Sequence, residues 1–545
     1  MDNQKIADLL FPNLTLTESD VFAKYPKRNL KDGQIVTRFA PSPTGLVHIG
    51  NFFQAFISYN LAKNSDGIYF LRIEDTDKKR EKKEAKEVLY KVLEYYGIKF
   101  NEYQTLDGKD VGEYGPYVQT QREDYYKVFA KKLVAEGKAF PCFCKKTEGK
   151  EEVLKQRETK WLENDACEYD PCRDLSYDEV KVHIDNGDSF AIRLKTKNKG
   201  DERIVFNDLI KGDIEAKANA KDVILLKSDG IPPYPFAHAV DDTLMGTTIV
   251  VRGEEYIAST PAHIEIFEAL GFPLIQYCHN PLICKLGDEG NRRKISKRYD
   301  PEANMMYYVE KGYPKDAILE YLLNMINSGF EIWRKNNPDL NWREFKFKPS
   351  EITAVAPLFD IVKFDDISKN IISKMSGEIL YQNWLNWAEE FDRDLAEVLR
   401  LDKEKYIKLC QMDRDGAAKP RKDIFNYSMM QDNFKYIFAS PSEFEIAEED
   451  KDKANEFLTE YLKNFKMPTS NEEWFNDVKE IAEKLGYAVD NKLYKANPEA
   501  FKGNTAKACE FIRLALTGTK NSPTLFTIMT ILGEEETKKR LSVKF

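Results

Sequence analysis

Apolar and polar positions divide the chain into a mixed first part and a helical second part. Up to about residue 300, short runs of β-branched and aromatic residues alternate with longer stretches whose apolar positions recur at helical spacing. Beyond about Asp300 the strand-like runs stop, and helical patterns continue to about residue 545. The chain is therefore predicted to fold as an α/β part followed by an all-α part.

Residues 34–73 predict a strand, a helix and a second strand in succession. Gln34–Ala40 is apolar-rich and β-branched, and Pro41 and Pro43 end it because proline removes backbone donors. A buried helix is predicted from Leu46 to about Lys63, and Ile68–Ile73 is the second strand. This order predicts a βαβ unit in a parallel sheet, whose carboxyl edge is where open α/β sheets bind nucleotides.

Further elements follow the same logic. Helices are predicted at about 79–96, 125–137 and 260–270, and strands at 190–194, 204–208, 223–226 and 247–252. The strands between 189 and 226 alternate with charged turns, which predicts an insertion that leaves the parallel sheet and returns to it. In the helical part, the capping box Ser470–Glu473 begins a helix that Gly486 ends.

These patterns give six segments. They are an N-terminal extension packed on the surface (1–33), two halves of a doubly wound α/β domain (34–140 and 223–300), an inserted subdomain (141–222) and two helical regions (301–375 and 376–545). A chain of 545 residues is long enough for roughly three or four domains.

Composition narrows the class of protein. The net charge of −9 argues against a generally basic nucleic-acid binder, although local basic patches are compatible with it. There is no apolar run of 18 or more residues, and the first residues lack the basic-then-apolar layout of a signal peptide. The protein is therefore expected to be cytosolic, with no membrane partner.

The first candidate site is the predicted helix tip. His48 is one of five histidines, and Gly50 keeps the start of the helix open to close approach. A partly exposed donor there, beside free backbone amides, can meet a nucleotide phosphate. The alternative is a plain loop between two core elements, which is the usual meaning of an isolated Pro/Gly loop.

Charged side chains also gather at the predicted carboxyl edge of the sheet. Arg38 and Arg252 each end a strand, and two guanidinium groups at one edge would repel unless anions lie between them. A substrate with two carboxylates, or with a carboxylate and phosphates, would resolve this, although each arginine alone could be a structural ion-pair partner. Glu74 follows a strand as well; it could bind a ligand or, as expected of Asp77, cap the next helix.

Residues 291–298 hold five cations in eight positions, which predicts a mobile basic loop. Such a run is usually a solvated turn. Its separation from His48 by a whole domain favours a second interpretation, in which a cationic loop closes over a triphosphate and neutralises charge that develops during phosphoryl or adenylyl transfer.

The cysteines are clustered. Four of the eight fall within 31 residues: Cys142, Cys144, Cys167 and Cys172. Disulfides are not expected in a cytosolic chain, and thiolates in a reducing compartment bind zinc well. A structural zinc site is therefore a candidate, although Cys-x-Cys is a weaker signal than paired Cys-x-x-Cys and Cys167 could be a bystander.

Taken together, these motifs resemble those of class I aminoacyl-tRNA synthetases, and specifically the bacterial-type glutamyl-tRNA synthetases. The stretch 38–51 is similar to the HIGH signature and 294–298 (Lys-Ile-Ser-Lys-Arg) to the KMSKS signature. Residues 71–77, 226–230 and 251–255 match the same family in order. Thr517-Gly518 and Ser522-Pro523 are similar, more loosely, to its C-terminal helical domain.

The resemblance implies ATP-dependent activation of L-glutamate to glutamyl-adenylate and transfer to the 3′-terminal adenosine of tRNA(Glu), leaving open whether tRNA(Gln) is also charged. Mg²⁺ would escort pyrophosphate, and the family suggests a monomer. The implied fold is a Rossmann-like catalytic domain with an inserted acceptor-binding subdomain, a helical stem-contact region and an all-α anticodon-binding domain.

The resemblance also assigns roles. His48 and Gly50 would bind ATP, with Glu255 nearby, and Lys294, Lys297 and Arg298 would hold its phosphates in the transition state. The amino-acid pocket would be lined by Arg38, Ser42, Glu74, Tyr234 and Arg252. The cysteine cluster matches the zinc-bearing insertion of many members.

The chain departs from the family pattern at several positions. His238 stands where asparagine is usual, prolines flank Tyr234, and Arg173-Asp174 leaves the fourth zinc ligand unmatched. The sequence argues against three other functions. A paralogue that glutamylates a modified tRNA base should lack the helical half, a glutaminyl enzyme would normally carry Pro-Glu-Pro-Asn in the first motif, and the intact 294–298 segment argues against a catalytically silent tRNA-binding module.

Overall fold

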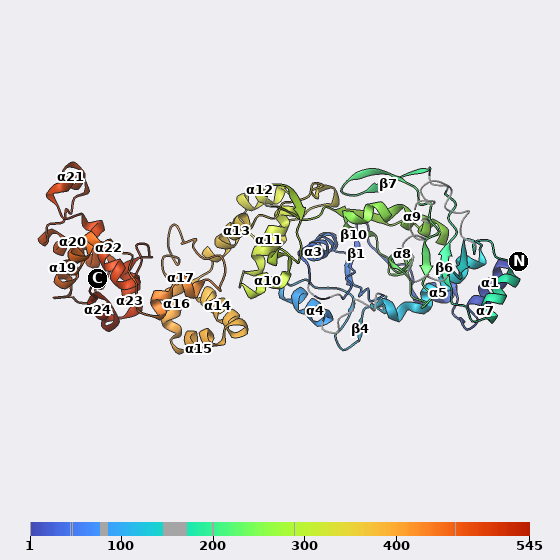
Figure 1. Ribbon diagram of the computed structural model, residues 1–545, viewed down its shortest axis with the longest axis horizontal. Helices are drawn as coiled ribbons and strands as arrows, with labels where there is room; N and C mark the ends of the chain where they lie inside the picture. Colours follow the sequence, from blue (N-terminus) through green and yellow to red (C-terminus); the bar gives the residue numbers. More distant parts are fainter. Residues whose placement is uncertain are drawn as a thin grey trace. The chain divides into compact units, whose positions relative to one another are not determined.

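The computed structural model describes residues 2–43, 45, 47–76, 85–144, 172–198, 201–287, 289–463 and 465–545. The chain divides into two compact units (Figure 1). The first comprises Met1–Tyr307 and Leu319–Asp360, and the second comprises Tyr308–Ile318 and Ile361–Phe545. Among the residues that the structure describes, no helix is both long and apolar enough to cross a lipid bilayer.

The predicted βαβ unit is confirmed. It consists of β1 (Val36–Phe39), α3 (Ile49–Asn64) and β2 (Ile68–Leu71), and β1 pairs with β2 in parallel. A second parallel pair is formed by β10 (Ile249–Gly253) and β11 (Gln276–Asn280). The Thr248 N–H donates to the Val36 carbonyl (3.0 Å), which brings the second pair alongside β1.

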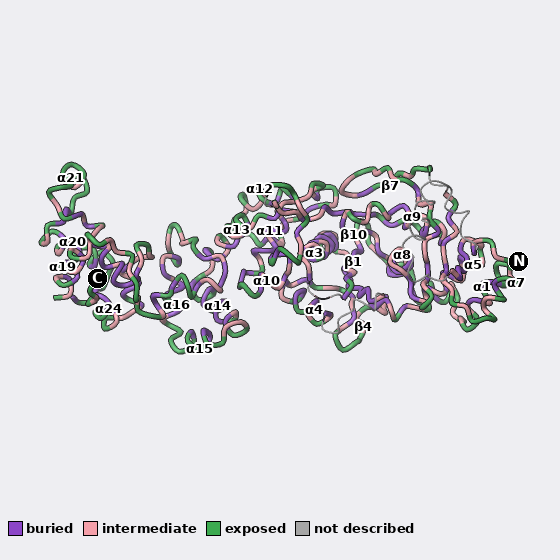
Figure 2. The backbone as a smooth tube through the Cα atoms, in the orientation of Figure 1, coloured by how far each residue is buried: buried purple, intermediate pink, exposed green. Residues whose placement is uncertain are grey.

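The carboxyl ends of β1 and β10 therefore lie at one edge, next to the start of α3. Helix α3 contacts β1, β2 and β10. It is buried on most of its surface, as Figure 2 shows, and its sequence is accordingly apolar around most of the helix rather than along one stripe. The α/β architecture predicted from the sequence is confirmed.

The remaining elements of the first unit surround this sheet. The other helices are α1 (Asp2–Leu10), α2 (Glu18–Lys24), α4 (Ala85–Tyr95), α5 (Glu123–Ala135), α7 (Tyr177–Asp185), α8 (Tyr234–Leu244), α9 (Thr260–Leu270) and α12 (Gly329–Asn336). The other strands are β3 (Tyr103–Gln104), β4 (Asp110–Val111), β5 (Ala139–Cys142), β6 (Ala191–Leu194), β7 (Arg203–Asp208), β8 (Gly212–Lys217), β9 (Ile224–Leu226), β12 (Cys284–Leu286) and β13 (Arg292–Lys294). The predicted start of α4 near Lys79, and Asp77, lie outside the described residues.

The segment predicted as an insertion contributes to two sheets. β5, β6 and β9 form an antiparallel three-stranded sheet. β7 and β8 form an antiparallel hairpin, and Asp208 at the end of β7 pairs with Tyr277 of β11 in parallel. The hairpin thus returns to the main sheet before β9, which places Asp208 beside the end of β11.

The prediction that residues 291–298 form a loop is wrong for its first half. Arg292–Lys294 is strand β13, which pairs antiparallel with β12. Arg292 and Lys294 are exposed, so the strand can pair through its backbone while keeping these charges in water. Only the residues from Ile295 onward form the predicted turn.

Helices are the regular elements among the described residues of the second unit, and one apolar core that includes Trp384, Phe457 and Phe511 holds it together. Its helices are α13 (Ile361–Ser373), α14 (Gly377–Phe391), α15 (Arg393–Leu401), α16 (Lys403–Gln411), α17 (Met430–Asn433), α18 (Lys435–Phe438), α19 (Lys451–Lys463), α20 (Asn471–Lys484), α21 (Asn491–Ala496), α22 (Thr505–Thr517), α23 (Leu525–Leu532) and α24 (Glu534–Leu541). The helices α10 (Met305–Glu310) and α11 (Lys315–Ile326) each contribute residues to both units.

The predicted N-cap of α20 is confirmed, because Ser470 Oγ accepts the Glu473 N–H at 3.1 Å. The second half of the predicted capping box differs. The Glu473 carboxylate accepts chiefly from the Thr469 backbone and hydroxyl, both at 2.6 Å. The preceding threonine supplies two donors where the box supplies one.

Candidate functional site

The start of α3 is closed by a histidine rather than by a small hydroxyl side chain. His48 is the N-cap of the helix, and its Nδ1 accepts the Gly50 N–H at 3.0 Å. A Cβ at position 50 would lie 3.1 Å from that nitrogen, which explains the glycine. Burial and the nearby Lys297 and Lys294 charges lower the pKa of His48 to about 4, so the imidazole is neutral at pH 7.

The two signature segments meet although they are far apart in the chain. His48 and Gly50 from the helix tip line the same pocket as Lys294 and Ile295 from the basic segment. Glu255 and Asn280, which follow or end strands β10 and β11, line it as well. The lining thus combines the Lys294 cation with the first turn of α3, two features that suit phosphate groups, and it also includes the Glu255 carboxylate.

The basic segment is held in place by Asp300. Both oxygens of this carboxylate accept from the Arg293 guanidinium (2.6 and 2.7 Å), and one accepts the Ser296 N–H at 2.8 Å. These contacts lower the pKa of Asp300 to about 2. Partial burial lowers the pKa of Lys297, while Arg298 is exposed.

Arg252, at the carboxyl end of β10, is a buried cation among neutral groups. It is 3% exposed, and it donates to His279 Nε2 (3.0 Å), Thr260 Oγ1 (2.9 Å) and Tyr234 Oη (3.3 Å). Its guanidinium also lies over the Tyr277 ring, 4.6 Å from the centroid. No carboxylate oxygen of the described chain lies within 4.0 Å of it, so its charge is uncompensated.

The histidines around Arg252 are kept neutral. Burial lowers the pKa of both His263 and His279, and the Arg252 charge lowers them further. Asp208 Oδ2 lies 2.7 Å from His279 Nδ1 and accepts a hydrogen bond from it, so the proton of the neutral ring is on Nδ1. The unprotonated Nε2 can therefore accept a hydrogen bond from Arg252. On His263, Nδ1 accepts from Arg252 at 3.3 Å, and Nε2 is buried with no partner among the described residues.

Arg38, in contrast, has an acid of its own. Its Nε donates to both oxygens of Asp242 (3.2 and 3.3 Å) and its Nη1 to the Val251 carbonyl (3.1 Å). The prediction that both arginines bind an external anion is therefore wrong for two of the Arg38 nitrogens, because Nε and Nη1 already bind acceptors of the protein. Its Nη2 makes no hydrogen bond within the described chain.

A charge network that the sequence did not reveal surrounds Arg38. Arg72 pairs with Glu74 (3.1 Å), Asp241 (3.7 Å) and Asp242 (2.7 Å), and Arg122 pairs with Asp241 (2.6 Å). Three guanidinium groups are thus balanced by three carboxylates. Two features of the sequence could have indicated this network. One is a charged residue between Leu71 and Ile73, and the other is the pair of adjacent aspartates in a largely apolar helix.

His238 connects this network with Arg252. Its Nδ1 lies 2.5 Å from Asp242 Oδ2, and its Nε2 lies 3.2 Å from the Tyr277 hydroxyl, whose ring packs under Arg252. Burial lowers the pKa of His238 to about 4. The histidine found where the family usually has asparagine is therefore a neutral buried link between the two arginines.

The other expected pocket residues differ in what they contact. Glu74 is 8% exposed; Oε1 accepts from Arg72, while Oε2 has no donor within the described chain, and burial raises the pKa of this carboxyl. Asp75 accepts the Thr120 N–H at 2.9 Å, in the short helix Gln119–Arg122, and the capping of the helix that follows residue 77 lies outside the described residues. Tyr234 accepts from Arg252, whereas Ser42 is exposed and makes no polar contact within the described residues.

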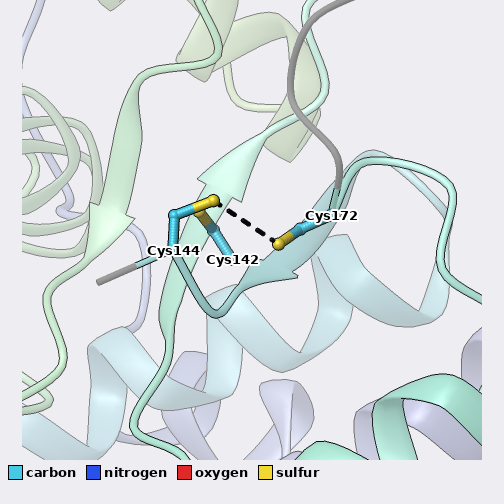
Figure 3. Close-up of side chains that lie close together, drawn as sticks. All are labelled: Cys142, Cys144 and Cys172. Atoms are coloured by element: carbon cyan, nitrogen blue, oxygen red, sulfur yellow. Dashed lines mark hydrogen bonds between the residues drawn. The ribbon is translucent and has the colours of Figure 1, made fainter. Parts of the chain in front are cut away.

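Three of the four clustered cysteines lie together, and Figure 3 shows their sulfur atoms facing one another. Cys142, Cys144 and Cys172 each offer a sulfur within 4.8 Å of the other two. The Phe143 N–H donates to Cys172 Sγ at 3.3 Å, and burial together with the neighbouring thiols raises the pKa of Cys172 to about 12. Cys167 lies outside the described residues.

Known proteins resemble this chain along nearly its whole length. The family described as "tRNA synthetases class I (E and Q), catalytic domain" matches residues 34–335, and that described as "Anticodon binding domain" matches residues 388–544. A "Glutamate--tRNA ligase" of Clostridium perfringens (strain 13 / Type A) is 41% identical over 550 residues, which cover 99% of this chain and 100% of the relative. One from Clostridium beijerinckii is 41% identical over 548 residues, 99% of both chains.

Solved structures share the fold. The structure titled "Glutamate-tRNA Synthetase from Elizabethkingia anophelis" is 25% identical, with a TM-score of 0.74 over 93% of this chain and 99% of that one. Another, a glutamate tRNA ligase from Elizabethkingia meningosepticum described as in complex with its amino acid, is 24% identical with a TM-score of 0.75.

Proposed function

Because the chain belongs to the class I tRNA synthetases of the glutamate and glutamine family, we propose that its site activates L-glutamate with ATP and transfers the glutamyl group to tRNA. The observation that carries this proposal is Arg252, a buried guanidinium without an acid partner among the described residues. Arg252 lies three residues before Glu255 in the chain, and Glu255 lines the pocket that His48 and Lys294 also line. An anionic substrate group and ATP phosphates would therefore lie side by side.

Arg252 suits the side-chain carboxylate of glutamate. The α-carboxylate loses its negative charge when it forms the adenylate, whereas the side-chain carboxylate keeps its charge throughout the reaction. The free energy of binding from a fixed cation without a protein counter-charge is therefore largest for the substrate group that stays anionic. A neutral amide in its place would leave Arg252 unpaired, which favours glutamate over glutamine.

Two further groups fit the rest of the amino acid. Glu74 Oε2 is unpartnered within the described chain and would accept from the substrate ammonium. Arg38 Nη2 and the Tyr234 hydroxyl would complete the pocket, and Ser42 lies at the same edge. The network of Arg72, Asp241 and Asp242 holds Arg38 and Glu74 without itself touching the substrate.

In the first step, an α-carboxylate oxygen of glutamate attacks the α-phosphorus of ATP and pyrophosphate leaves. His48 is neutral and supplies no charge; it orders the first turn of α3 by accepting the Gly50 N–H. Lys294, Lys297 and Arg298 would supply positive charge to the departing phosphates. In the second step, the hydroxyl of the 3′-terminal adenosine of tRNA attacks the glutamyl carbonyl and AMP leaves.

Two metals are implied by the family. Among the described residues, the three cysteines form the only cluster of metal-ligating side chains spaced for a single cation, so no protein carboxylate set for Mg²⁺ is found there and no step is assigned to it. The cysteines fit zinc: Cys142, Cys144 and Cys172 offer three soft ligands. Zinc would lower the thiol pKa values and tie β5 to the segment before α7, which is a structural role.

Whether the enzyme charges tRNA(Gln) as well as tRNA(Glu) depends on how the helical unit reads the anticodon. The anticodon-binding family matches in that unit. Aminoacylation of each purified tRNA with radiolabelled glutamate, and with glutamine as control, tests the proposal. We expect glutamyl-tRNA(Glu) to form and glutaminyl-tRNA to be absent. Failure to charge tRNA(Glu) with glutamate would refute the function.

We expect the enzyme to act as a monomer in the cytoplasm, which sedimentation and cell fractionation test.

A further inference from the structure

The N-terminal segment 18–30 reaches into the charge network rather than only covering the surface. Tyr25, which follows α2, is buried; its hydroxyl donates to the Gly115 carbonyl at 2.8 Å. The same hydroxyl accepts from Arg122 Nη1 at 3.0 Å. Arg122 is fully buried and binds Asp241, so a residue of the extension is one hydrogen bond away from the acids of α8.

A second residue of the segment closes the end of α8. Both guanidinium prongs of Arg28 bind Glu102 (2.6 and 2.7 Å), and its Nε donates to the carbonyl of Met245, the C-cap of α8 (2.7 Å). Gly246 has a φ of +69°, and a Cβ there would lie 2.9 Å from the Arg28 side chain. The glycine thus permits both the turn and the approach of Arg28.

These contacts form a continuous path to the proposed amino-acid pocket. From Tyr25 Oη the successive separations are 3.0 Å to Arg122, 2.6 Å to Asp241, 3.7 Å on to Arg72, 2.7 Å to Asp242 and 3.2 Å to Arg38. Every side chain in this path is buried. In a low-dielectric interior, displacement of one charged member changes the positions that its neighbours prefer.

We propose that the segment 18–30 is a positioning element of the amino-acid pocket, with Tyr25 and Arg28 as its positioning residues. The inference rests on the proposed function, because it assigns the pocket of Arg38 and Glu74 to glutamate. Arg122 depends on Tyr25 more than the number of its contacts suggests, since its Nη2 is already buried without a partner. Without the Tyr25 hydroxyl, Arg122 keeps its hydrogen bonds to Asp241 and to the Pro116 carbonyl. Asp241 also accepts from Gln119 and Tyr126, so the expected change is a small shift of the Arg122–Asp241 pair within the network.

The experiment compares two single-hydroxyl deletions in the full-length enzyme. Tyr25→Phe removes the hydroxyl that binds Arg122. Tyr114→Phe is the matched control, because the Tyr114 hydroxyl holds the same segment through the Pro26 carbonyl (2.9 Å) but does not contact the network. For Tyr25→Phe we expect the KM for glutamate to rise about fivefold, with the KM for ATP and kcat unchanged within about twofold, the equivalent of one lost hydrogen bond.

A role in folding alone would give a different result. It would lower the thermal midpoint of both variants alike and would leave the glutamate KM of the folded fraction unchanged. Equal glutamate KM values in the two variants would therefore overturn the inference, as would a parallel rise in the ATP KM. If the unchanged enzyme showed no glutamate-dependent activity, the proposed function and this inference would both fail.

A paired substitution tests the same element from its other end. Arg28→Gln combined with Glu102→Gln removes the ion pair while leaving no unpaired charge, so it is expected to fold even if Tyr25→Phe does not. We expect the same selective rise in the glutamate KM. An unchanged glutamate KM in this double variant would contradict the role given to Arg28.

Discussion

Replacing Arg252 with methionine should separate substrate binding from stability. The guanidinium is buried, and no acid of the described chain lies within ion-pair distance of it. Methionine keeps much of the side-chain volume while removing the charge. In the proposed complex, the substrate carboxylate is the missing counter-charge, so the loss should fall on glutamate binding.

The magnitude follows from the contacts. A charge-assisted hydrogen bond contributes about 1.5–3 kcal/mol, and a guanidinium can offer two to one carboxylate. Loss of about 3–4 kcal/mol corresponds to a rise of two to three orders of magnitude in the glutamate requirement. The KM for ATP should be nearly unchanged, because Lys294 and the helix tip are untouched.

The control is another buried arginine. Arg72 has three acids around it, so Arg72→Met would leave uncompensated carboxylates and should cost about 3–5 kcal/mol of unfolding free energy. Arg252→Met leaves no acid unpaired and should cost distinctly less. Its neutral neighbours lose donors, among them His279 and Thr260.

Glutamate-dependent exchange of pyrophosphate into ATP, measured with tRNA present, gives the two KM values, and urea denaturation gives the stability. Thermal shift with and without glutamate provides an independent measure of binding. A glutamate KM that stayed within about threefold of the unchanged enzyme would show that Arg252 does not bind a substrate carboxylate.

Three further predictions follow from other parts of the site. Lys297→Ala should lower the rate of glutamate activation by about two orders of magnitude while tRNA binding persists, and unchanged pyrophosphate exchange would remove this lysine from the reaction. The pKa of His238 in the folded chain is about 4, below its ordinary value, so the unfolded chain binds a proton at this histidine first as the pH falls. The free energy of unfolding should therefore be highest above pH 6.5 and decline toward pH 4. Urea titrations should show a loss of about 1.5 kcal/mol between pH 7 and pH 5. A pH-independent midpoint over that range would contradict the assignment. Zinc analysis should find one ion per chain, lost in Cys172→Ser and retained in Cys284→Ser, with a lower thermal midpoint when the ion is removed; equal metal content in both variants would exclude the cluster.

Most of the fold followed from local pattern. The βαβ unit, the helix 260–270 and the N-cap Ser470 were predictable because periodicity and capping act over a few residues. The strand at Arg292–Lys294 was missed because its sequence has neither apolar alternation nor β-branched residues. Its pairing with Cys284–Leu286 depends on a partner that the local pattern does not specify.

The candidate site was predictable where a motif is contiguous and obscure where it is assembled from distant elements. His48 and the basic segment were found because each has a distinctive sequence, and the structure brings them to one pocket. The pairing of Arg38 with Asp242 spans 204 residues, so nothing near either residue indicates it. Charge balance among buried side chains is a property of three-dimensional packing. The sequence could therefore not show that Arg252, unlike the other buried arginines of the described residues, has no acid within ion-pair distance.

The central claim is that one ATP lies between the His48 helix tip and the Lys294–Arg298 segment while Arg252 holds the side-chain carboxylate of glutamate beside it. The most direct measurement is a crystal structure of the enzyme with a non-hydrolysable glutamyl-adenylate analogue. We expect the side-chain carboxylate to lie within hydrogen-bonding distance of Arg252 and the adenylate phosphate to face the first turn of α3. An analogue bound with that carboxylate away from Arg252, or outside the pocket of His48 and Lys294, would contradict it.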